Sequence, residues 1–287
     1  LFCALLQSNE VETRTFLLIG FEEDHQSVLK LYFIEKYHKL ALLISIPFEG
    51  TPLCAEQCDR DLVWIGTEVG DICAITISAL LKGTSEQIAV ARHFTASSTS
   101  IVKLCKYNKR MWVLSQNTIG VWNISKNVCV KTIVLEAPCK TIVFTPFRSI
   151  WAGTRIVNTR TFKQVSLKSM GSQSPIITSC YVSAANEVWT SHEDKTIIIW
   201  DAETRSFKGI FQMAYLTKSL CAFGRYVWST TGSSLICWFS KSHTVIKEIE
   251  IITIAESSFE CLQTLPIVSP NGHIAIAATT LNHGLVI

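Results

Sequence analysis

Five tryptophans recur in this sequence at nearly constant intervals, and each stands in a short phrase of strand-forming residues. They lie 48, 39, 38 and 39 residues apart, at Trp64, Trp112, Trp151, Trp189 and Trp228. Similar phrases without a tryptophan occur at residues 17–20 and 274–277. Self-similarity at a fixed period of about 40 residues is the signature of a repeat architecture. The sequence is therefore predicted to contain seven structural units.

Each unit is predicted to consist of strands. A second apolar run follows most of the anchors, and Trp122, Trp200, Trp238 and Tyr32 take the same place in four of these runs. Shorter runs precede and follow, and Gly, Asn, Asp and Ser separate them, as is typical of strands joined by turns. The predicted fold is all-β: a seven-bladed propeller with four short antiparallel strands per blade, in which residues 1–287 form a single domain.

One unit resembles a WD40 repeat very closely. In residues 188–204, Trp200-Asp201 matches the signature dipeptide of that family, and Asp194 matches its turn aspartate. Another unit keeps half of the dipeptide, as Trp122-Asn123. The Gly-His that usually opens such repeats is not found at matching positions, which leaves open whether the hydrogen-bonded network from that His to the Trp forms. The chain is identified as a divergent WD40-like propeller.

The resemblance implies a structural role for the repeat residues, whose aromatic rings are expected to act as wedges between blades. These structural residues are Trp64, Trp112, Trp122, Trp151, Trp189, Asp194, Trp200, Asp201, Trp228 and Trp238.

The two ends of the sequence suggest a piece of a larger protein. Residues 283–287 are predicted to form a third strand in the last unit, and no fourth strand follows. Because a propeller leaves no open edge, the missing strand is expected outside this segment, either after Ile287 or before Leu1. The chain also starts without Met, so we expect it to be excised from a larger multidomain chain.

Similar propellers with eroded signatures occur at the C-termini of large signalling proteins. The resemblance is to leucine-rich-repeat (Roco-type) kinases first, and to Rho exchange factors and DENN-domain proteins as alternatives. It implies a regulatory or dimerisation module that performs no chemistry itself, although the parent chain of the first class would be a serine/threonine kinase.

Composition and cysteine usage limit the class of protein and the cellular compartment that can be expected. Hydrophobic residues make up 48% of the chain and charged residues 17%, which excludes a disordered polymer. No apolar run reaches the roughly 18 residues that a membrane-spanning helix needs. The eleven cysteines include no pair of CxxC motifs. A reducing, cytoplasmic location is expected, with no metal and no cofactor, and Cys54 and Cys58 lack the companions that a zinc site requires.

No catalytic motif supports an enzyme. His192-Glu193-Asp194 falls in a predicted hairpin turn, where polar side chains serve backbone hydrogen bonding. Cys105, Cys180, Cys221 and Cys261 recur before the anchors and are interpreted as small packing residues. A propeller hydrolase, which would need carboxylates or histidines on several inner strands, remains a remote alternative.

The loops are predicted to divide by charge. Hairpins between second and third strands carry Glu22, Glu23, Asp24, Glu68, Asp71, Glu193 and Asp194 against Lys195 and Arg155. The loops at the other ends of the strands form a candidate basic interaction face made of Lys36, Lys39, Lys106, Lys109, Arg110, Lys126, Arg160, Lys163, Arg205, Lys208 and Lys241.

Two interpretations of this basic face stay open. Charged loops are expected on any exposed surface. Alternatively, the face docks an anionic partner such as an acidic protein tail or an inositol-lipid surface. Nucleic acid is the least expected, because aromatic stacking platforms are not interleaved with the basic residues. The predicted partners are proteins, in cis or in trans, with self-association as one possibility.

Overall fold

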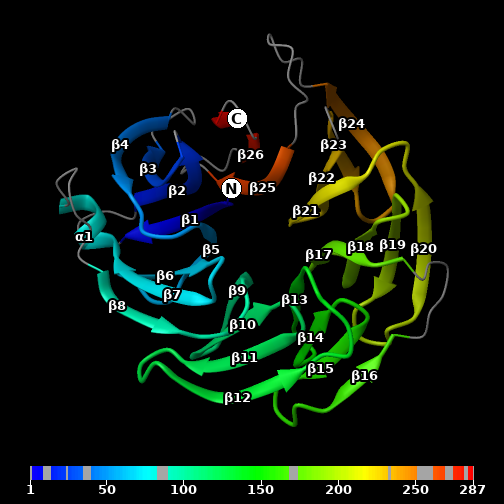
Figure 1. The fold of residues 1–287 in the computed structure, drawn as a ribbon. Coiled ribbons are helices and arrows are strands. Elements are labelled where there is room, and N and C mark those ends of the chain that lie inside the picture. Colours follow the sequence, from blue (N-terminus) through cyan, green and yellow to red (C-terminus); the bar gives the residue numbers. More distant parts are fainter. Residues whose placement is uncertain are drawn as a thin grey trace. The chain divides into compact units, whose positions relative to one another are not determined.

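The computed structural model describes residues 2–8, 14–23, 25–34, 40–82, 90–167, 174–231, 234–250, 261–268, 274–280 and 284–286. Chain contacts divide it into two compact units, the first formed by Leu1–Pro138 with Ser269–His273 and the second by Cys139–Val268 with Ile274–Ile287. Each unit is a series of antiparallel sheets whose strands follow one another in chain order (Figure 1).

The first unit holds three four-stranded sheets and a short helix. Its elements are β1 (Phe2–Ser8), β2 (Arg14–Glu23), β3 (Gln26–Ile34), β4 (Leu40–Pro47), β5 (Pro52–Gln57), β6 (Leu62–Thr67), β7 (Asp71–Thr76), α1 (Ile77–Lys82), β8 (Val90–Thr95), β9 (Ile101–Tyr107), β10 (Arg110–Ser115), β11 (Thr118–Asn123) and β12 (Val128–Val134).

The second unit holds three more four-stranded sheets and one sheet of three strands. Its strands are β13 (Ile142–Thr145), β14 (Ser149–Ala152), β15 (Arg155–Asn158), β16 (Gln164–Ser166), β17 (Ile176–Val182), β18 (Glu187–His192), β19 (Thr196–Asp201), β20 (Phe207–Gln212), β21 (Thr217–Phe223), β22 (Tyr226–Thr231), β23 (Ser234–Phe239), β24 (Thr244–Glu250), β25 (Cys261–Val268), β26 (Ile274–Thr280) and β27 (Gly284–Val286).

The expected count of seven blades is corrected to six. Six sheets have the four antiparallel strands of a propeller blade, whereas the last segment contributes the three-stranded sheet β25–β26–β27 among the described residues. The strand β1 does not complete that sheet, because it pairs with β2 as the first strand of the first sheet. The all-β fold of propeller blades is confirmed.

Large rings fill the space between neighbouring sheets within each unit. In the second unit, the second-strand Trp of one sheet meets the third-strand Trp of the next, with centroids 6.3 Å apart for Trp151 and Trp200 and 5.9 Å for Trp189 and Trp238. In the first unit, Phe94 lies between Trp64 and Trp122, at 5.2 Å from each. The tryptophan spacing in the sequence thus reflects one second-strand Trp in each of five consecutive sheets.

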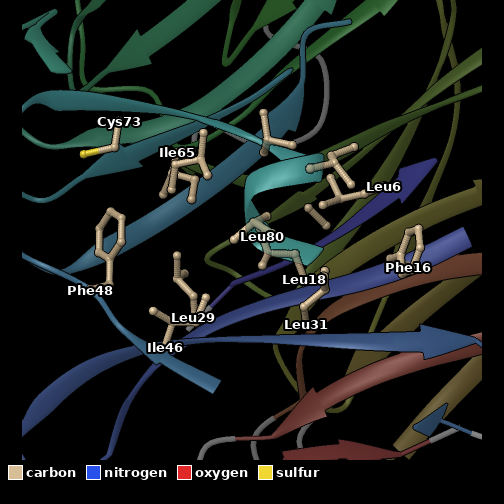
Figure 2. Close-up of a cluster of buried hydrophobic side chains, with 14 residues drawn as sticks. Leu6, Phe16, Leu18, Leu29, Leu31, Ile46, Phe48, Ile65, Cys73 and Leu80 are labelled. Carbon is tan, nitrogen blue, oxygen red and sulfur yellow. The ribbon is translucent and has the colours of Figure 1, made fainter. Parts of the chain in front are cut away.

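The first two sheets share an aliphatic core (Figure 2). Leu18, Leu29 and Leu31 of the first sheet pack with Ile65 of the second, and all four are fully buried or nearly so. Leu80 of α1 belongs to the same cluster. This helix was not expected from the sequence. The residue before it, Thr76, caps its N-terminus, since Thr76 Oγ1 accepts the backbone N–H of Ala79.

A β-bulge recurs in the fourth strand of five sheets. In each of these sheets, one residue of the fourth strand has no direct partner on the third strand. It lies beside the third-strand position that holds an aromatic ring or an aliphatic side chain. The extra residues are Leu43, Ala91, Val130, Lys208 and Ile246. Such a bulge bends the strand and changes the direction of the extra side chain.

Candidate interaction surface

The closely WD40-like sheet β17–β20 contains a buried polar network. Trp200 Nε1 donates to Thr190 Oγ1 at 3.1 Å, and Thr190 Oγ1 lies 3.0 Å from His192 Nε2. His192 Nδ1 lies 3.0 Å from the carbonyl oxygen of Ser174. A neutral imidazole with its proton on Nδ1 donates to Ser174 and can accept at Nε2 from the hydroxyl of Thr190, which also donates to the carbonyl oxygen of Ile198 at 3.2 Å, so the two acceptors share one proton. Burial lowers the pKa of His192, which favours this neutral form.

The sequence left the existence of this network open because the usual Gly-His is missing. The structure supplies the imidazole from the end of β18, two residues after Thr190, so His192 takes part in the network and not only in the turn. Asp194 has the expected turn role, since its Oδ1 accepts the backbone N–H and the hydroxyl of Thr196. These polar groups are hydrogen-bonded to one another and to the backbone.

The aspartate of the signature dipeptide closes the turn between the third and fourth strands. Asp201 Oδ1 accepts the backbone N–H groups of Glu203 and Thr204, and the bond from Thr204 lowers the pKa of Asp201. Asn123 and Asn158 do the same in their own sheets, accepting from Lys126 N and Thr161 N. An amide oxygen therefore replaces the aspartate, and Asn158 was not recognised from the sequence.

A buried carboxylate distinguishes the same sheet. Glu187 is 2% exposed, and its Oε1 lies 2.6 Å from Lys208 Nζ. His243 Nε2 of the next sheet lies 3.0 Å from Oε1, and Trp189 Nε1 donates to Oε2 at 3.0 Å. The bulge at Lys208 turns its side chain back across the sheet toward Glu187. This cluster joins the sheets β17–β20 and β21–β24 of the second unit.

The candidate basic residues divide between the two units. In the first unit, Lys106, Lys109, Arg110 and Lys126 are exposed at one end of the sheet β9–β12. In the second unit, Arg160, Lys163, Arg205 and Lys241 are exposed in turns between third and fourth strands. Lys208 is exposed as well, and its Nζ is paired with Glu187. Lys36 and Lys39 lie outside the described residues.

Two arginines that the sequence reasoning missed complete the surface of the second unit. Arg148 and Arg225 lie in the turns between first and second strands, and both are exposed. Their carbonyl groups accept the backbone N–H groups of Thr159 and Ser240, which ties these turns to the turns that carry Arg160 and Lys241. The position of each arginine one or a few residues before an anchor phrase was the available signal. We call the following set the basic tip surface: Arg148, Arg160, Lys163, Arg205, Arg225 and Lys241.

The opposite ends of the sheets differ between the units. In the first unit, Glu22, Glu68 and Asp71 lie at the hairpins between second and third strands, as expected. In the second unit, Glu193 pairs with Lys140 at 2.9 Å, so the acidic character expected there is partly neutralised. The predicted Asp24 lies outside the described residues.

The cysteines occupy packing positions. Cys105, Cys180 and Cys221 stand directly opposite Trp112, Trp189 and Trp228 in their sheets. Burial raises the pKa of Cys105 to about 12, which makes its thiolate inaccessible near neutral pH. Across the described ranges, no group of three or more His, Cys, Asp or Glu side chains is arranged to hold a metal ion. No described helix is long and apolar enough to cross a membrane.

Comparison with known proteins identifies the fold. No protein-family model matches the sequence, and no curated protein matches it. Solved structures do match: 1529 chains, so many that the fold by itself selects no function. One is a chain in the crystal structure of the mitotic checkpoint complex, with a TM-score of 0.73 and 14% identity, covering 98% of this chain and 84% of that chain. At this identity the likeness is one of fold alone.

Proposed function

We propose that this chain is a non-catalytic interaction module that presents rigid turns to partner proteins. The observation that carries the proposal is that the polar side chains of the WD40-like sheet are engaged in its own structure. His192, Asp194, Asp201 and Glu187 are held in structural hydrogen bonds, whereas the basic tip surface is exposed. Turns held on a stable sheet are the usual place of recognition. The likeness to a chain from a multi-protein complex is in keeping with this role.

We further propose that the module belongs to a larger cytoplasmic signalling protein. A regulatory or dimerisation module of a Roco-type kinase is the first candidate, and a module of a Rho exchange factor or DENN-domain protein is the second. Sequencing the transcript on both sides of this segment tests the proposal. A kinase domain immediately upstream supports the first candidate, and an initiator Met directly before Leu1 with a stop codon after Ile287 contradicts both.

The interaction role itself is tested by site-specific photo-crosslinking in cells. A photoreactive amino acid is introduced at Arg160 or Lys241 in one pair of variants and at Lys195 or Thr154, at the opposite ends of the second unit's sheets, in another. Proteins cross-linked reproducibly at either set of positions support an interaction module. Failure of all four positions to cross-link any protein above the level of a crosslinker-free chain contradicts it.

A second candidate function is docking to an anionic lipid surface. The exposed basic turns of both units favour it. Its test is co-sedimentation with vesicles that contain inositol phospholipids. Binding that disappears when Lys106, Lys109 and Lys126 are reversed in charge supports this candidate, and absence of binding at low ionic strength contradicts it.

A further inference from the structure

The basic tip surface of the second unit is strongly unbalanced in charge. Its six cationic side chains share their end of the sheets with three carboxylates. Glu187 is already paired with Lys208, and Asp201 is bound by backbone N–H groups of its own turn. Asp201 keeps its negative charge, so Asp201 and Glu203 are the carboxylates left to balance the six among the described residues, and none of the six forms an ion pair within the described part of the chain. Their charges are therefore available to a partner.

Exposed aromatic side chains stand beside two of these cations. Phe147 precedes Arg148 and Tyr226 follows Arg225, and each ring-bearing residue is 36% exposed. Tyrosine, phenylalanine and arginine are the residue types enriched at protein–protein interfaces, where they carry most of the binding energy. The surface thus combines charge with apolar anchors, which a purely solvated set of loops does not require.

The turns that carry these cations are held in place before any partner binds. Asn158 Oδ1 accepts the N–H groups of Arg160 and Thr161, at 3.0 and 2.9 Å. Asp201 Oδ1 fixes the turn of Arg205 in the same way. A surface whose backbone is already ordered loses less conformational entropy on binding.

The rings favour a protein partner over a single-stranded nucleic acid. Tyr226 lies against Phe239 at 6.1 Å, and the neighbouring Phe207 lies against Trp200 at 6.2 Å. Each of these rings contacts another ring of its own sheet. A single strand needs a succession of ring faces on which its bases stack, whereas the exposed rings beside the cations, Phe147 and Tyr226, belong to separate sheets and form no such succession.

We infer that the basic tip surface binds an extended acidic segment of a partner protein that also carries aromatic residues. This inference rests on the proposed interaction role and names the partner chemistry. The acidic side chains pair with the six cations, and the aromatic residues of the segment pack on Phe147 and Tyr226. Arginine offers the bidentate geometry that carboxylates favour, so Arg148 and Arg225 are the central contacts.

The test uses the 287-residue chain and a fluorescein-labelled peptide of alternating Glu and Tyr, followed by fluorescence anisotropy. The double reversal Arg148→Glu/Arg225→Glu is expected to weaken binding by at least about tenfold. The matched control Lys131→Glu/Lys247→Glu changes the net charge equally on exposed outer strands and is expected to leave binding within about twofold. Unchanged thermal unfolding of both variants shows that the fold is intact.

A second variant separates the aromatic anchors from charge. Phe147→Ala/Tyr226→Ala is expected to weaken the Glu-Tyr peptide by about fivefold and to leave an all-Glu peptide of equal charge unaffected. Equal weakening by the control reversal, or no loss with Arg148→Glu/Arg225→Glu, overturns the inference. Tighter binding of an oligothymidylate or of inositol-phospholipid vesicles than of the peptide, abolished by the same reversal, also overturns it. Cross-linking of proteins at Lys195 or Thr154 alone would leave the interaction role standing while this inference fails.

Discussion

The sheets β17–β20 and β9–β12 have the same strand order and a tryptophan at the same two places, but they differ in how these rings are held. Trp200 on the third strand lies opposite Val188 of the second strand. Its indole N–H donates to Thr190, two residues further along that second strand. In β9–β12 the equivalent place holds Val113, and Trp122 Nε1 has no hydrogen-bond partner within the described residues.

The difference continues along the strands. The place of Glu187 in β17–β20 is taken by the exposed Arg110 in β9–β12, and the extra bulge residue is Lys208 in one sheet and Val130 in the other. The sheet β21–β24 is intermediate in its hydrogen bonding, because Trp238 Nε1 donates to Ser229. Rings therefore pack in each of these three sheets, whereas the hydrogen bonds to their indole N–H groups are present in two of them. Apolar burial supplies the common stability, and hydrogen bonds add to it sheet by sheet.

The largest expected effect comes from breaking the buried ion pair. Lys208→Met removes the cation 2.6 Å from Glu187 and leaves a buried carboxylate supported by His243 and Trp189. The free energy of unfolding is expected to fall by about 3 kcal/mol, because an uncompensated buried charge is costly. Urea denaturation measures it. Lys131→Met on β12, an exposed site, serves as the control and is expected to change stability by less than about 0.5 kcal/mol. Restoration of most of the loss by Glu187→Leu/Lys208→Met would show that the unpaired charge was the cause.

Removing the hydroxyl at the centre of the network makes β17–β20 resemble β9–β12. Thr190→Val leaves Trp200 Nε1 and His192 Nε2 without the shared partner, and is expected to lower the free energy of unfolding by about 2 kcal/mol. Thr190→Ser keeps the hydroxyl and should lose much less. Equal losses in the two variants would mean that packing of the methyl group, and not the network, stabilises this sheet.

The reverse change supplies the missing partner in β9–β12. The indole of Trp122 lies over Gly120, where an added Cβ would approach Nε1 to 2.6 Å, so the ring stands close to the strand that faces Val113. Val113→Thr is expected to raise the free energy of unfolding by about 1 kcal/mol. The same change at Val227 in β21–β24 is expected to destabilise, because the indole N–H groups of Trp189 and Trp238 in its cluster are already bound to Glu187 and Ser229. Destabilisation by Val113→Thr would show that the hydroxyl does not reach the indole.

The smallest expected effect is a dependence of stability on pH that comes from the hydrogen-bonded network of β17–β20. Burial lowers the pKa of His192 in the folded chain, so the unfolded chain binds more protons once the pH falls below about 6.5. The stability contributed by the neutral imidazole is present above that pH and is lost as the pH falls through it. Thermal unfolding of wild type and His192→Gln between pH 7.5 and 5.5 measures the difference. A constant gap between the two curves would rule out this linkage.

Local patterns in the sequence were sufficient for the fold class and for several turns. Tryptophan spacing predicted the sheets, and each anchor lies in a second strand of the described units. The role of Asp194 was predicted from its place in a hairpin. These features depend on residues a few positions apart, where the alternation of a strand and the preferences of a turn are strong.

The polar cluster and the full basic tip surface could not be predicted in this way. Glu187 and His243 are 56 residues apart, and the link depends on the packing of two sheets. Lys208 is exposed as expected, but nothing in the sequence marks the bulge from which its Nζ reaches Glu187. Arg148 and Arg160 become neighbours only through a backbone hydrogen bond between two turns. The count of seven included a last unit that was already expected to lack its fourth strand, and among the described residues this unit is a sheet of three strands and not a full blade.

The recurrent bulges have a consequence for how this chain behaves at high concentration. Fourth strands are sheet edges. Three of them, β4, β12 and β24, carry Leu42, Val130 and Ile246, and about half of the area of each residue is exposed. A regular edge with such side chains is a template for a strand of another molecule. One extra residue near the middle of each of these edges breaks the even spacing of free N–H and C=O groups and twists the strand. The same bulge that aims Lys208 at Glu187 in one sheet thus protects its counterparts from edge-to-edge aggregation.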